Sequence, residues 1–266
     1  MASQRRLLES LEQAVHQCRP LALRYFQSKS LRVEHKADRS PVTAADRAIE
    51  ERLRRALARI APGEPILGEE FGASGQLSDT YWTIDPIDGT RAFSRGLPSW
   101  GIMVGRVEQG QARLGLVDFP AIGVTIGVAT GVPAYEQTGG GQSRLPSARP
   151  LASLASAVIF HGGVRWWPAR AVSGMTILMK ACYLERAYGD CYGYLWALTG
   201  LADAVIDYGV KPWDMVPLAA LAEATGRRMT DFSGHDSFTG PETIMGHASM
   251  VRLISQQLHG RGQPKT

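Results

Sequence analysis

The sequence predicts an α+β fold in which helices and sheets are stacked in layers, and three observations indicate it. Apolar residues recur at helical spacing near the N-terminus, short strand-like runs follow after Gly63, and helical and strand-like segments alternate in the last third of the chain. A chain of 266 residues with 44% hydrophobic content can bury a core of ordinary density. We therefore expect an N-terminal half, residues 1–140, and a C-terminal half, residues 141–266, packed as one unit.

The N-terminal segment has the pattern of two amphipathic helices. Apolar side chains recur at helical spacing over residues 7–22, where Pro20 predicts a kink, and again over residues 43–60. Thr43 is a candidate cap for the second helix. Asp46 would then lie in the first turn, where the helix dipole favours an anion.

The middle of the chain has the texture of a largely antiparallel sheet. Its strand-like runs are residues 65–67, 81–84, 101–107, 112–117 and 123–128. The next segment, residues 137–150, contains three consecutive glycines and two prolines, which oppose regular structure. We expect this segment to be a linker or a mobile hairpin.

The remaining segments alternate helical and strand-like patterns, which predicts a more mixed sheet. Strands are expected over residues 157–160 and 204–207, and helices over residues 172–181, 192–201, 215–225 and 247–258.

Composition argues against several classes of protein. No apolar run approaches the roughly 18 residues of a membrane span, and the first residues lack the hydrophobic stretch of a signal peptide, so we expect a cytoplasmic protein without a membrane partner. The three cysteines form no C-x-x-C pair, which argues against a disulfide framework and a thiolate zinc site. The net charge is +4, but the arginines are spread among acids, so solvated faces are favoured over nucleic-acid binding.

Acidic residues follow or begin apolar elements in four separate segments. They are Asp46, Glu69 with Glu70, Asp85 with Asp88, and Asp214. Hard oxygen ligands on rigid supports suit Mg²⁺ better than zinc. The six histidines offer no alternative metal site, because none of them has H-x-H or H-E-x-x-H spacing, and this also favours Mg²⁺ over zinc.

The segment DPIDGT at residues 85–90 is the centre of this pattern. Pro86 fixes a turn after the strand, so both carboxylates and the Ile87 carbonyl can face one point, and Gly89 permits close approach of the backbone. Spacing alone leaves an ordinary capped β-turn as an alternative, because Asp, Pro, Gly and Thr are all turn residues.

Four motifs in order resemble the inositol monophosphatase family of metal-dependent, lithium-sensitive phosphatases. They are Gly68-Glu69-Glu70, the run WTIDPIDGT at residues 82–90, Trp213-Asp214, and Glu223-Ala224-Thr225-Gly226. The resemblance extends from about Lys36 to Gly246. It implies a layered α-β-α-β-α sandwich of the sugar phosphatase type. It also implies a dimer, because members of the family are usually dimeric.

The resemblance also implies metal ligands and catalytic roles. Glu69, Asp85 and the carbonyl of Ile87 match ligands of a first Mg²⁺, and Asp85, Asp88 and Asp214 match ligands of a second. Asp46 and Thr90, with Glu69, match the positions that orient and activate the attacking water and help to hold a third, weaker Mg²⁺. Asp88, Gly89 and Thr90 would lie at the substrate, with the N–H groups of the last two offered to phosphate.

Such a site implies in-line attack by water between two metal ions, without a covalent phosphoenzyme. The haloacid-dehalogenase phosphatases use an aspartyl nucleophile in D-x-D, where the carboxylates are two positions apart. Asp85 and Asp88 are three positions apart and are interrupted by Pro86.

Other stretches resemble the histidinol-phosphate phosphatases of the family more than the inositol enzymes. They are residues 40–46, 88–98, 188–194 and 211–214. The third is the most telling, because Asp190 places a negative charge where inositol enzymes usually carry a small residue. A carboxylate there suits a substrate with an ammonium and an imidazole, and histidinol phosphate has both.

Asp207 matches a position at which family members hold an acidic substrate contact, and is a second candidate cation acceptor. The alternatives are a helix N-cap for Asp190 and a surface acid at a strand end for Asp207. Arg186, Arg91 and Lys36 are candidates for binding or steering phosphate, and for Lys36 a solvated loop lysine is the alternative.

We therefore expect a Mg²⁺-dependent hydrolase of a small phosphomonoester, forming a homodimer. Its expected reaction converts L-histidinol phosphate and water to L-histidinol and phosphate. Inositol-1-monophosphatase activity, or activity on another small polyol phosphate, is the alternative. A second alternative, from another class, is a non-catalytic partner of the transcription or ribosome-assembly machinery.

Overall fold

The computed structural model describes the chain except for residues 1, 27, 29–32, 36–40 and 259–266. It divides into two compact units. The first comprises Met1–Arg144 with Val216–Leu221, and the second comprises Leu145–Met215 with Ala222–Thr266.

The first unit is built on an eight-stranded sheet in the order β10-β9-β8-β7-β6-β5-β3-β4. Its strands are β3 (Ile66–Gly68), β4 (Gly72–Ala73), β5 (Tyr81–Asp88), β6 (Gly101–Glu108), β7 (Gln111–Phe119), β8 (Val124–Ala129), β9 (Val132–Thr138) and β10 (Gly141–Arg144). Only β3 and β5 pair in parallel, so the prediction of a largely antiparallel sheet is confirmed. A separate two-stranded sheet pairs β1 (Val33–His35) with β2 (Pro41–Thr43).

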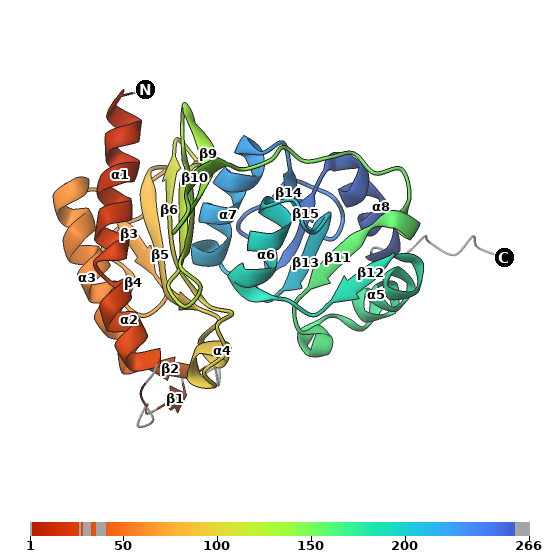
Figure 1. Ribbon diagram of the computed structural model, residues 1–266, viewed down its shortest axis with the longest axis horizontal. Coiled ribbons are helices and arrows are strands. Elements are labelled where there is room, and N and C mark those ends of the chain that lie inside the picture. The colour runs from red at the N-terminus through yellow and green to blue at the C-terminus, as the bar shows by residue number, and fades with distance from the viewer. Residues whose placement is uncertain (1, 27, 29–32, 36–40, 259–266) are drawn as a thin grey trace. The chain divides into compact units, whose positions relative to one another are not determined.

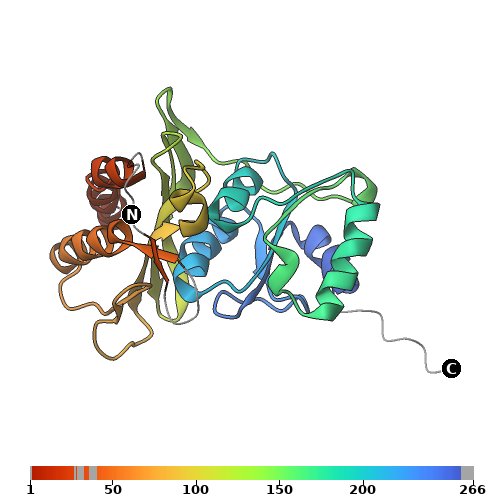
Figure 2. The ribbon, with the colours of Figure 1, turned by 90° about the horizontal axis from the view of Figure 1, so that it is seen from below.

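Three helices cover one face of this sheet: α1 (Ala2–His16), α2 (Arg19–Phe26) and α3 (Ala44–Ile60) (Figures 1 and 2). The first predicted helix is broken, because α1 ends before Pro20 and α2 starts again at Arg19. Pro20 thus lies in the first turn of α2, where its missing N–H has no intrahelical partner to lose. The cap of α3 is as predicted, since the Thr43 side chain accepts a hydrogen bond from the N–H of Ala45 at 3.1 Å.

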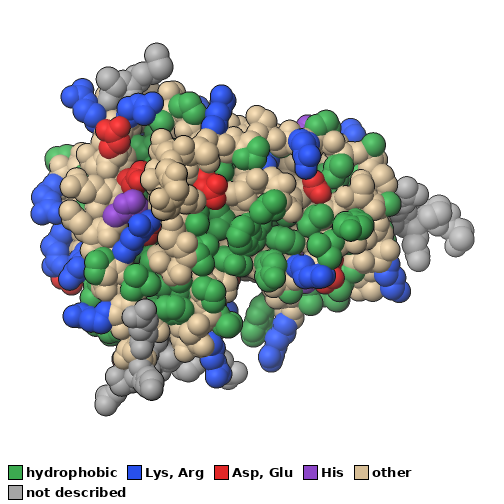
Figure 3. Space-filling view, in the orientation of Figure 1, with side chains coloured by type: hydrophobic (Ala, Val, Ile, Leu, Met, Phe, Trp, Pro, Cys, Tyr) green, Lys and Arg blue, Asp and Glu red, His purple; other side chains and the backbone are tan. Residues whose placement is uncertain are grey.

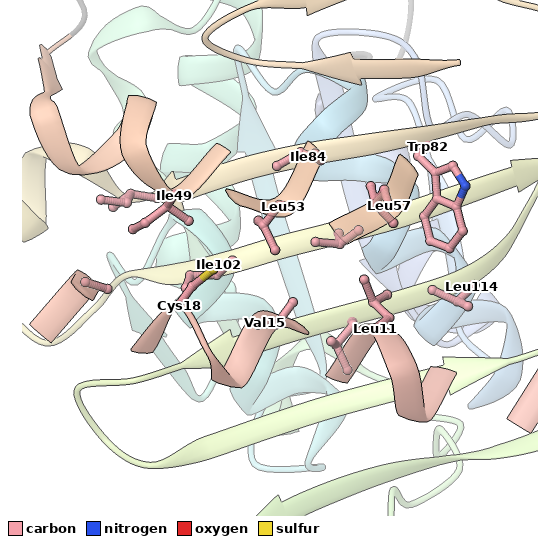
Figure 4. Packing of buried hydrophobic residues seen from close by; sticks show 14 of the residues in the cluster. Leu11, Val15, Cys18, Ile49, Leu53, Leu57, Trp82, Ile84, Ile102 and Leu114 are labelled. Atoms are coloured by element: carbon pink, nitrogen blue, oxygen red, sulfur yellow. The ribbon is translucent and has the colours of Figure 1, made fainter. Parts of the chain in front are cut away.

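The apolar faces of these helices form one core with the sheet (Figure 4). Leu11 and Val15 of α1 and Leu53 of α3 belong to one cluster, and both helices pack directly on the strands. Trp82 of β5 and Leu114 of β7 supply the sheet side of this cluster, and all five side chains are buried. Each fully buried aliphatic side chain contributes about 1.5–3 kcal/mol, so this face is a main source of the unit's stability.

The opposite face of the sheet receives part of α7 (Pro212–Ala224). A Cβ at Gly105 of β6 would lie 2.8 Å from the ring of Pro217, and one at Gly115 of β7 would lie 2.1 Å from the Pro217 carbonyl oxygen. Only glycine at both positions allows the helix backbone to approach this closely. The Val216–Leu221 segment of α7 is thereby fixed on the sheet of the first unit.

Of the two alternatives for residues 137–150, the hairpin is confirmed in the first half of the segment. Residues 141–144 form β10, which pairs antiparallel with β9 in a hairpin. The three glycines do not oppose the strands, because Gly139 and Gly140 form the turn and Gly141, with a φ of +115°, begins β10. Both prolines fall after the hairpin, at residues 146 and 150, and irregular backbone begins only there.

The second unit is built on a five-stranded sheet in the order β12-β11-β13-β15-β14. Its strands are β11 (Val158–His161), β12 (Leu184–Arg186), β13 (Ala204–Tyr208), β14 (Arg228–Thr230) and β15 (Glu242–Gly246). β11 is parallel to β12 and β13, whereas β15 is antiparallel to β13 and β14, so the expected mixed sheet is confirmed.

Helices lie on both faces of this second sheet. α5 (Ala169–Ala181) and α8 (Ala248–Leu258) share a buried cluster with Ile159 of β11 and Ile206 of β13. On the other face, Gly193 of α6 (Asp190–Leu198) lies toward Val205 of β13. Each unit is thus a sheet covered by helices, as the layered prediction requires.

The expectations drawn from composition can also be compared with the structure. No helix in the described part of the chain is both long and apolar enough to cross a membrane. Cys18, Cys182 and Cys191 are all free thiols. On the face seen in Figure 3, Lys and Arg side chains are scattered and form no continuous patch.

Candidate metal and substrate site

Asp85 and Asp88 come from the end of β5. Asp85 is only 2% exposed, and its Oδ1 accepts a hydrogen bond from the N–H of Ile87 at 3.0 Å. The pairing of β5 with β6 shifts register between Asp85 and Asp88, where Pro86 has no N–H to donate. One carboxylate oxygen from each aspartate lies within 4.8 Å of the other. The segment is therefore an irregular strand end that directs two carboxylates to one point, and not the ordinary β-turn left open by the sequence.

Gly89 connects β5 to α4 (Thr90–Ser94) and cannot be replaced without strain. Its φ is +83°, in the left-handed region that favours glycine. A Cβ at this position would also lie 2.7 Å from the carbonyl oxygen of Ser99. Both backbone conformation and space therefore require glycine immediately after Asp88.

Thr90 and Asp46 meet beside this strand end, although they are far apart in the sequence. The Thr90 hydroxyl donates to the carbonyl oxygen of Ile87 at 2.9 Å and lies 3.5 Å from Oδ1 of Asp46. The other oxygen of Asp46 accepts from the N–H and hydroxyl of Thr43 at 2.7 and 2.6 Å. The cap of α3 thus holds Asp46 in one orientation with one oxygen facing Thr90.

Burial raises the pKa of Asp46 to about 6. The two hydrogen bonds from Thr43 oppose this shift, and the negative charge of Glu69 adds to it. Asp46 and Glu69 therefore lie close enough to interact electrostatically. A carboxyl group poised in this range is suited to proton transfer or to binding a cation near neutral pH.

Glu69 follows β3, where its N–H donates to the Ile84 carbonyl of β5 at 3.1 Å. The same loop is braced by Glu50 of α3, which is fully buried. Glu50 accepts from the N–H of Glu70 at 2.7 Å and is paired with Arg54 at 2.7 Å.

Glu50 is absent from the site that the sequence predicts, because arginines spread among acids, as in residues 46–55 of α3, favour a solvated face. That interpretation holds for Arg55 and Glu51, an exposed pair, but is wrong for Glu50 and Arg54. The available signal was Gly68, directly before Glu69. A Cβ there would lie 2.0 Å from Oε1 of Glu50, so the glycine makes room for the brace.

Asp214 lies in the first turn of α7, and its Oδ2 accepts from the N–H of Lys211 at 2.8 Å. Two residues later α7 enters the segment Val216–Leu221, which belongs to the first unit.

In the second unit, the carboxylate of Asp207 lies close to two glycines, Gly162 and Gly189, and Asp190 directly follows Gly189. Asp207 of β13 is 7% exposed, so it is not the surface acid considered as an alternative. A Cβ at Gly162 would lie 1.9 Å from Oδ1 of Asp207, and one at Gly189 would lie 3.3 Å from Oδ2. The N–H of Tyr208 donates to the same carboxylate at 2.8 Å.

Asp190 is the first residue of α6, whose N-cap is Gly189, so the proposed N-cap role for Asp190 is wrong. Its φ of 54° is in the left-handed region, which a non-glycine residue seldom adopts and which Asp tolerates better than most. Burial raises the pKa of Asp207 to about 7, and the charge of Asp190 adds to this shift. The two carboxylates therefore interact.

The basic candidates are less well placed. Arg91 and Arg186 are both exposed, and Arg186 donates to the carbonyl oxygen of Glu185 at 2.7 Å. Lys36 lies outside the described residues. Arg91 and Arg186 are thus solvent-exposed side chains.

Comparisons with known proteins agree with this geometry. A model of the inositol monophosphatase family matches residues 3–261. A histidinol-phosphatase of Mycobacterium tuberculosis is 34% identical over 210 residues, which cover 79% of this chain and 81% of that protein. A histidinol-phosphatase of Chlorobaculum parvum is 32% identical over 225 residues, 85% of each chain. The extragenic suppressor protein suhB of Bartonella henselae shares the fold, with a TM-score of 0.84 at 21% identity, over 94% of this chain and 97% of that one.

Fold, carboxylates and relatives together define a phosphatase, a hydrolase acting on phosphomonoesters. The chain belongs to the inositol monophosphatase family, whose members depend on metal ions. The non-catalytic alternative is not needed to account for these features.

Proposed function

We propose that this protein is a Mg²⁺-dependent histidinol-phosphate phosphatase. The observation that carries the proposal is the pair of interacting carboxylates, Asp190 and Asp207, in the second unit. Two acidic groups suit the ammonium and imidazole of histidinol phosphate by charge-assisted hydrogen bonding. The similarity to proteins named histidinol-phosphatase supports the same substrate.

The residues at the end of β5 fit a magnesium ion by the chemistry of their donors. Asp85, Asp88 and the Ile87 carbonyl offer only oxygen atoms, which Mg²⁺ prefers. We propose that Glu69 and Asp214 complete the ligands, Asp214 being presented by the first turn of α7. Bound there, the cations would supply charge neutralisation at the phosphoryl group and a nucleophilic water at neutral pH.

Thr90 and Asp46 would orient the attacking water. The Thr90 hydroxyl proton is directed to the Ile87 carbonyl, so lone pairs on its oxygen remain to accept a hydrogen bond from water. Asp46, with one oxygen held by Thr43, keeps its second oxygen toward this point. Glu69 is the third group proposed for this task, because its negative charge raises the pKa of Asp46 and it therefore lies near that carboxylate.

Inositol 1-phosphate is the alternative substrate, and one observation favours it. The pKa of Asp207 is raised to about 7, so a large fraction of this side chain is neutral at pH 7 and can donate a hydrogen bond to a polyol hydroxyl. Asp190, in contrast, is exposed and offers a negative charge that a neutral polyol does not require.

Phosphate release from both substrates by the purified protein with Mg²⁺ tests the proposal. We expect kcat/KM for L-histidinol phosphate to exceed that for inositol 1-phosphate by at least tenfold, about 1.4 kcal/mol of discrimination. The Asp88→Asn variant serves as the background control for both. A preference for inositol 1-phosphate would contradict the proposed substrate and leave the phosphatase chemistry intact.

A further inference from the structure

The second unit contains a cavity of about 300 Å³ at the end of its sheet opposite to Asp207. Arg149, Arg227, His247, Asp203 and Thr199 are among its lining residues. Asp203 directly precedes β13, and Asp207 lies four residues further along. At about 3.3 Å per residue the two positions are roughly 13 Å apart, so the cavity is separate from the proposed substrate contacts.

Arg227 is a buried cation without a paired anion. Its side chain is 7% exposed, and Nη1 donates to the carbonyl oxygens of Pro146 at 3.0 Å and Thr225 at 3.5 Å. No carboxylate of the described residues lies within ion-pair distance of it. Burial lowers the pKa of Arg227 to about 10, although the charge of Asp203 opposes the shift.

Arg106 shows what a buried arginine ordinarily requires. It is 8% exposed, about as buried as Arg227, but it forms two hydrogen bonds of 2.8 Å to Glu64 and a third of 3.0 Å to Glu108. A buried charge is costly unless it is paired. Arg227 instead has two carbonyl oxygens and the more distant charge of Asp203, so its guanidinium can still pair with a negative group from outside the chain.

His247 adds a hydrogen-bond donor with a defined orientation. The backbone N–H of Ser249 donates to Nδ1 of His247 at 3.1 Å. Nδ1 is therefore an acceptor, and the ring proton of the neutral imidazole is on Nε2. The Ser249 hydroxyl, 2.9 Å from the same Nδ1, also accepts from the N–H of Leu151, which fixes the arrangement.

Arg149 is exposed beside the cavity and has no hydrogen bond or ion pair within the described chain, so a second guanidinium is available. Asp203 is occupied, because its Oδ2 accepts from the N–H of Val158 at 2.8 Å. It contributes the single acidic side chain among the lining residues.

We propose that this cavity binds a small phosphate monoester as a ligand distinct from the substrate. Arg227 and Arg149 would pair with the phosphate oxygens, and His247 would donate a third hydrogen bond from Nε2. The volume exceeds that of phosphate alone and leaves room for an organic group, for which Thr199 and Asp203 offer hydrogen-bonding atoms. The site does not depend on the proposed histidinol-phosphate activity.

Inorganic phosphate is the probe for a calorimetric titration of the full chain in the presence of EDTA, with chloride at matched ionic strength as the reference. We expect saturable binding by the wild type and by Asp88→Asn, whose substitution lies outside the cavity. Arg149→Ser should bind at least fivefold more weakly, because it loses one charge-assisted contact. Arg59→Ser, which removes the same charge from the exposed face of α3, should bind like the wild type.

Arg227→Lys gives a second test, because it keeps the charge and loses the planar donor geometry. Its circular dichroism spectrum and melting curve should resemble those of the wild type, while its affinity for phosphate falls. Equal affinities in the wild type, Arg149→Ser and Arg227→Lys would overturn the proposal, as would the absence of saturable binding. Turnover of histidinol phosphate plays no part in this outcome, so failure here is separate from failure of the proposed function.

Discussion

The backbone N–H of Glu70 donates a 2.7 Å hydrogen bond to Glu50, a carboxylate that is fully buried and paired with Arg54. This contact connects α3, which carries Asp46, to the loop that carries Glu69. Two of the proposed catalytic groups are thereby held by one helix. The geometry of the loop therefore depends on a residue that would not itself touch the substrate.

Replacing Glu50 with Gln should destabilise the protein and weaken metal binding. The amide removes the negative charge that offsets Arg54, and its NH₂ group faces backbone donors, so we expect a loss of about 2–4 kcal/mol in the free energy of unfolding. The Mg²⁺ concentration for half-maximal activity should rise several-fold. Urea unfolding and a Mg²⁺ titration measure the two effects.

Glu51→Gln is the matched control, since Glu51 pairs with Arg55 on the exposed side of the same helix. An exposed pair of this kind contributes about 0–1 kcal/mol. Equal behaviour of the two variants would show that Glu50 does not brace the loop.

Gly89→Ala should abolish most activity. Alanine would have to adopt a positive φ here, and its Cβ would clash with the carbonyl oxygen of Ser99. The backbone between Asp88 and Thr90 therefore has to move. A displacement of about 1 Å in a catalytic group can reduce turnover by about a hundredfold. Gly96→Ala has a similar φ of +74° but meets nothing within 4 Å, so it should lose about 1 kcal/mol of stability and keep its activity. Loss of activity in both variants would assign the effect to backbone strain alone.

The stability of the protein should depend on pH through Asp207. Its pKa is raised to about 7 in the folded state, so the unfolded chain loses this proton first as pH rises. The free energy of unfolding therefore falls between about pH 4 and pH 7, by up to about 1.4 kcal/mol per pH unit.

Asp207→Asn removes this dependence and should gain stability relative to the wild type as pH rises through the window. Urea unfolding at pH 5, 6, 7 and 8 in EDTA measures the difference between the two proteins. The contribution of Asp46, whose pKa is also raised, is present in both and cancels. Parallel curves would contradict the raised pKa of Asp207.

Chelation should remove activity, and added Mg²⁺ should restore it. The donors at the end of β5 are all oxygen atoms, so Ca²⁺ should compete with Mg²⁺ without supporting the same rate, because its coordination is larger and less rigid. Phosphate release after dialysis against EDTA, with each ion added back, is the measurement. Full activity of the chelated protein would exclude the metal-dependent mechanism.

The sequence predicted those elements whose start and buried face are determined by residues within the element itself. Thr43 followed by Asp46 specified the start of α3, and the period of its apolar residues specified its buried face. β12, β14 and β15 were not predicted, because runs of three to five residues show too little alternation to be distinguished from loops. Residues 137–150 were predicted as a linker or a hairpin without a choice between the two, because glycines in a turn have the same composition as a linker.

The site was predictable where its motif is continuous and not where it depends on a distant partner. The geometry of residues 85–90 is determined by the residue types within that segment. The burial of Glu50, in contrast, depends on Gly68, which belongs to another element. Likewise, the sequence places Asp207 at a strand end but does not show that Gly162 makes room for its carboxylate. Such close approaches are properties of the packed fold.

Asp190 is the residue proposed to recognise the cationic part of the substrate, and its backbone conformation determines which substitution can test this role. Threonine would remove the charge, but its β-branched side chain at a φ of 54° would add strain and confuse the result. Asparagine tolerates this conformation and removes only the charge. We expect Asp190→Asn to lower kcat/KM for histidinol phosphate by about tenfold, because an ionic hydrogen bond is replaced by a neutral one. Turnover of a phosphomonoester whose alcohol part is uncharged, such as glycerol 2-phosphate, should change less than twofold. Equal losses on both substrates would mean that Asp190 supports the start of α6 and does not recognise a cation.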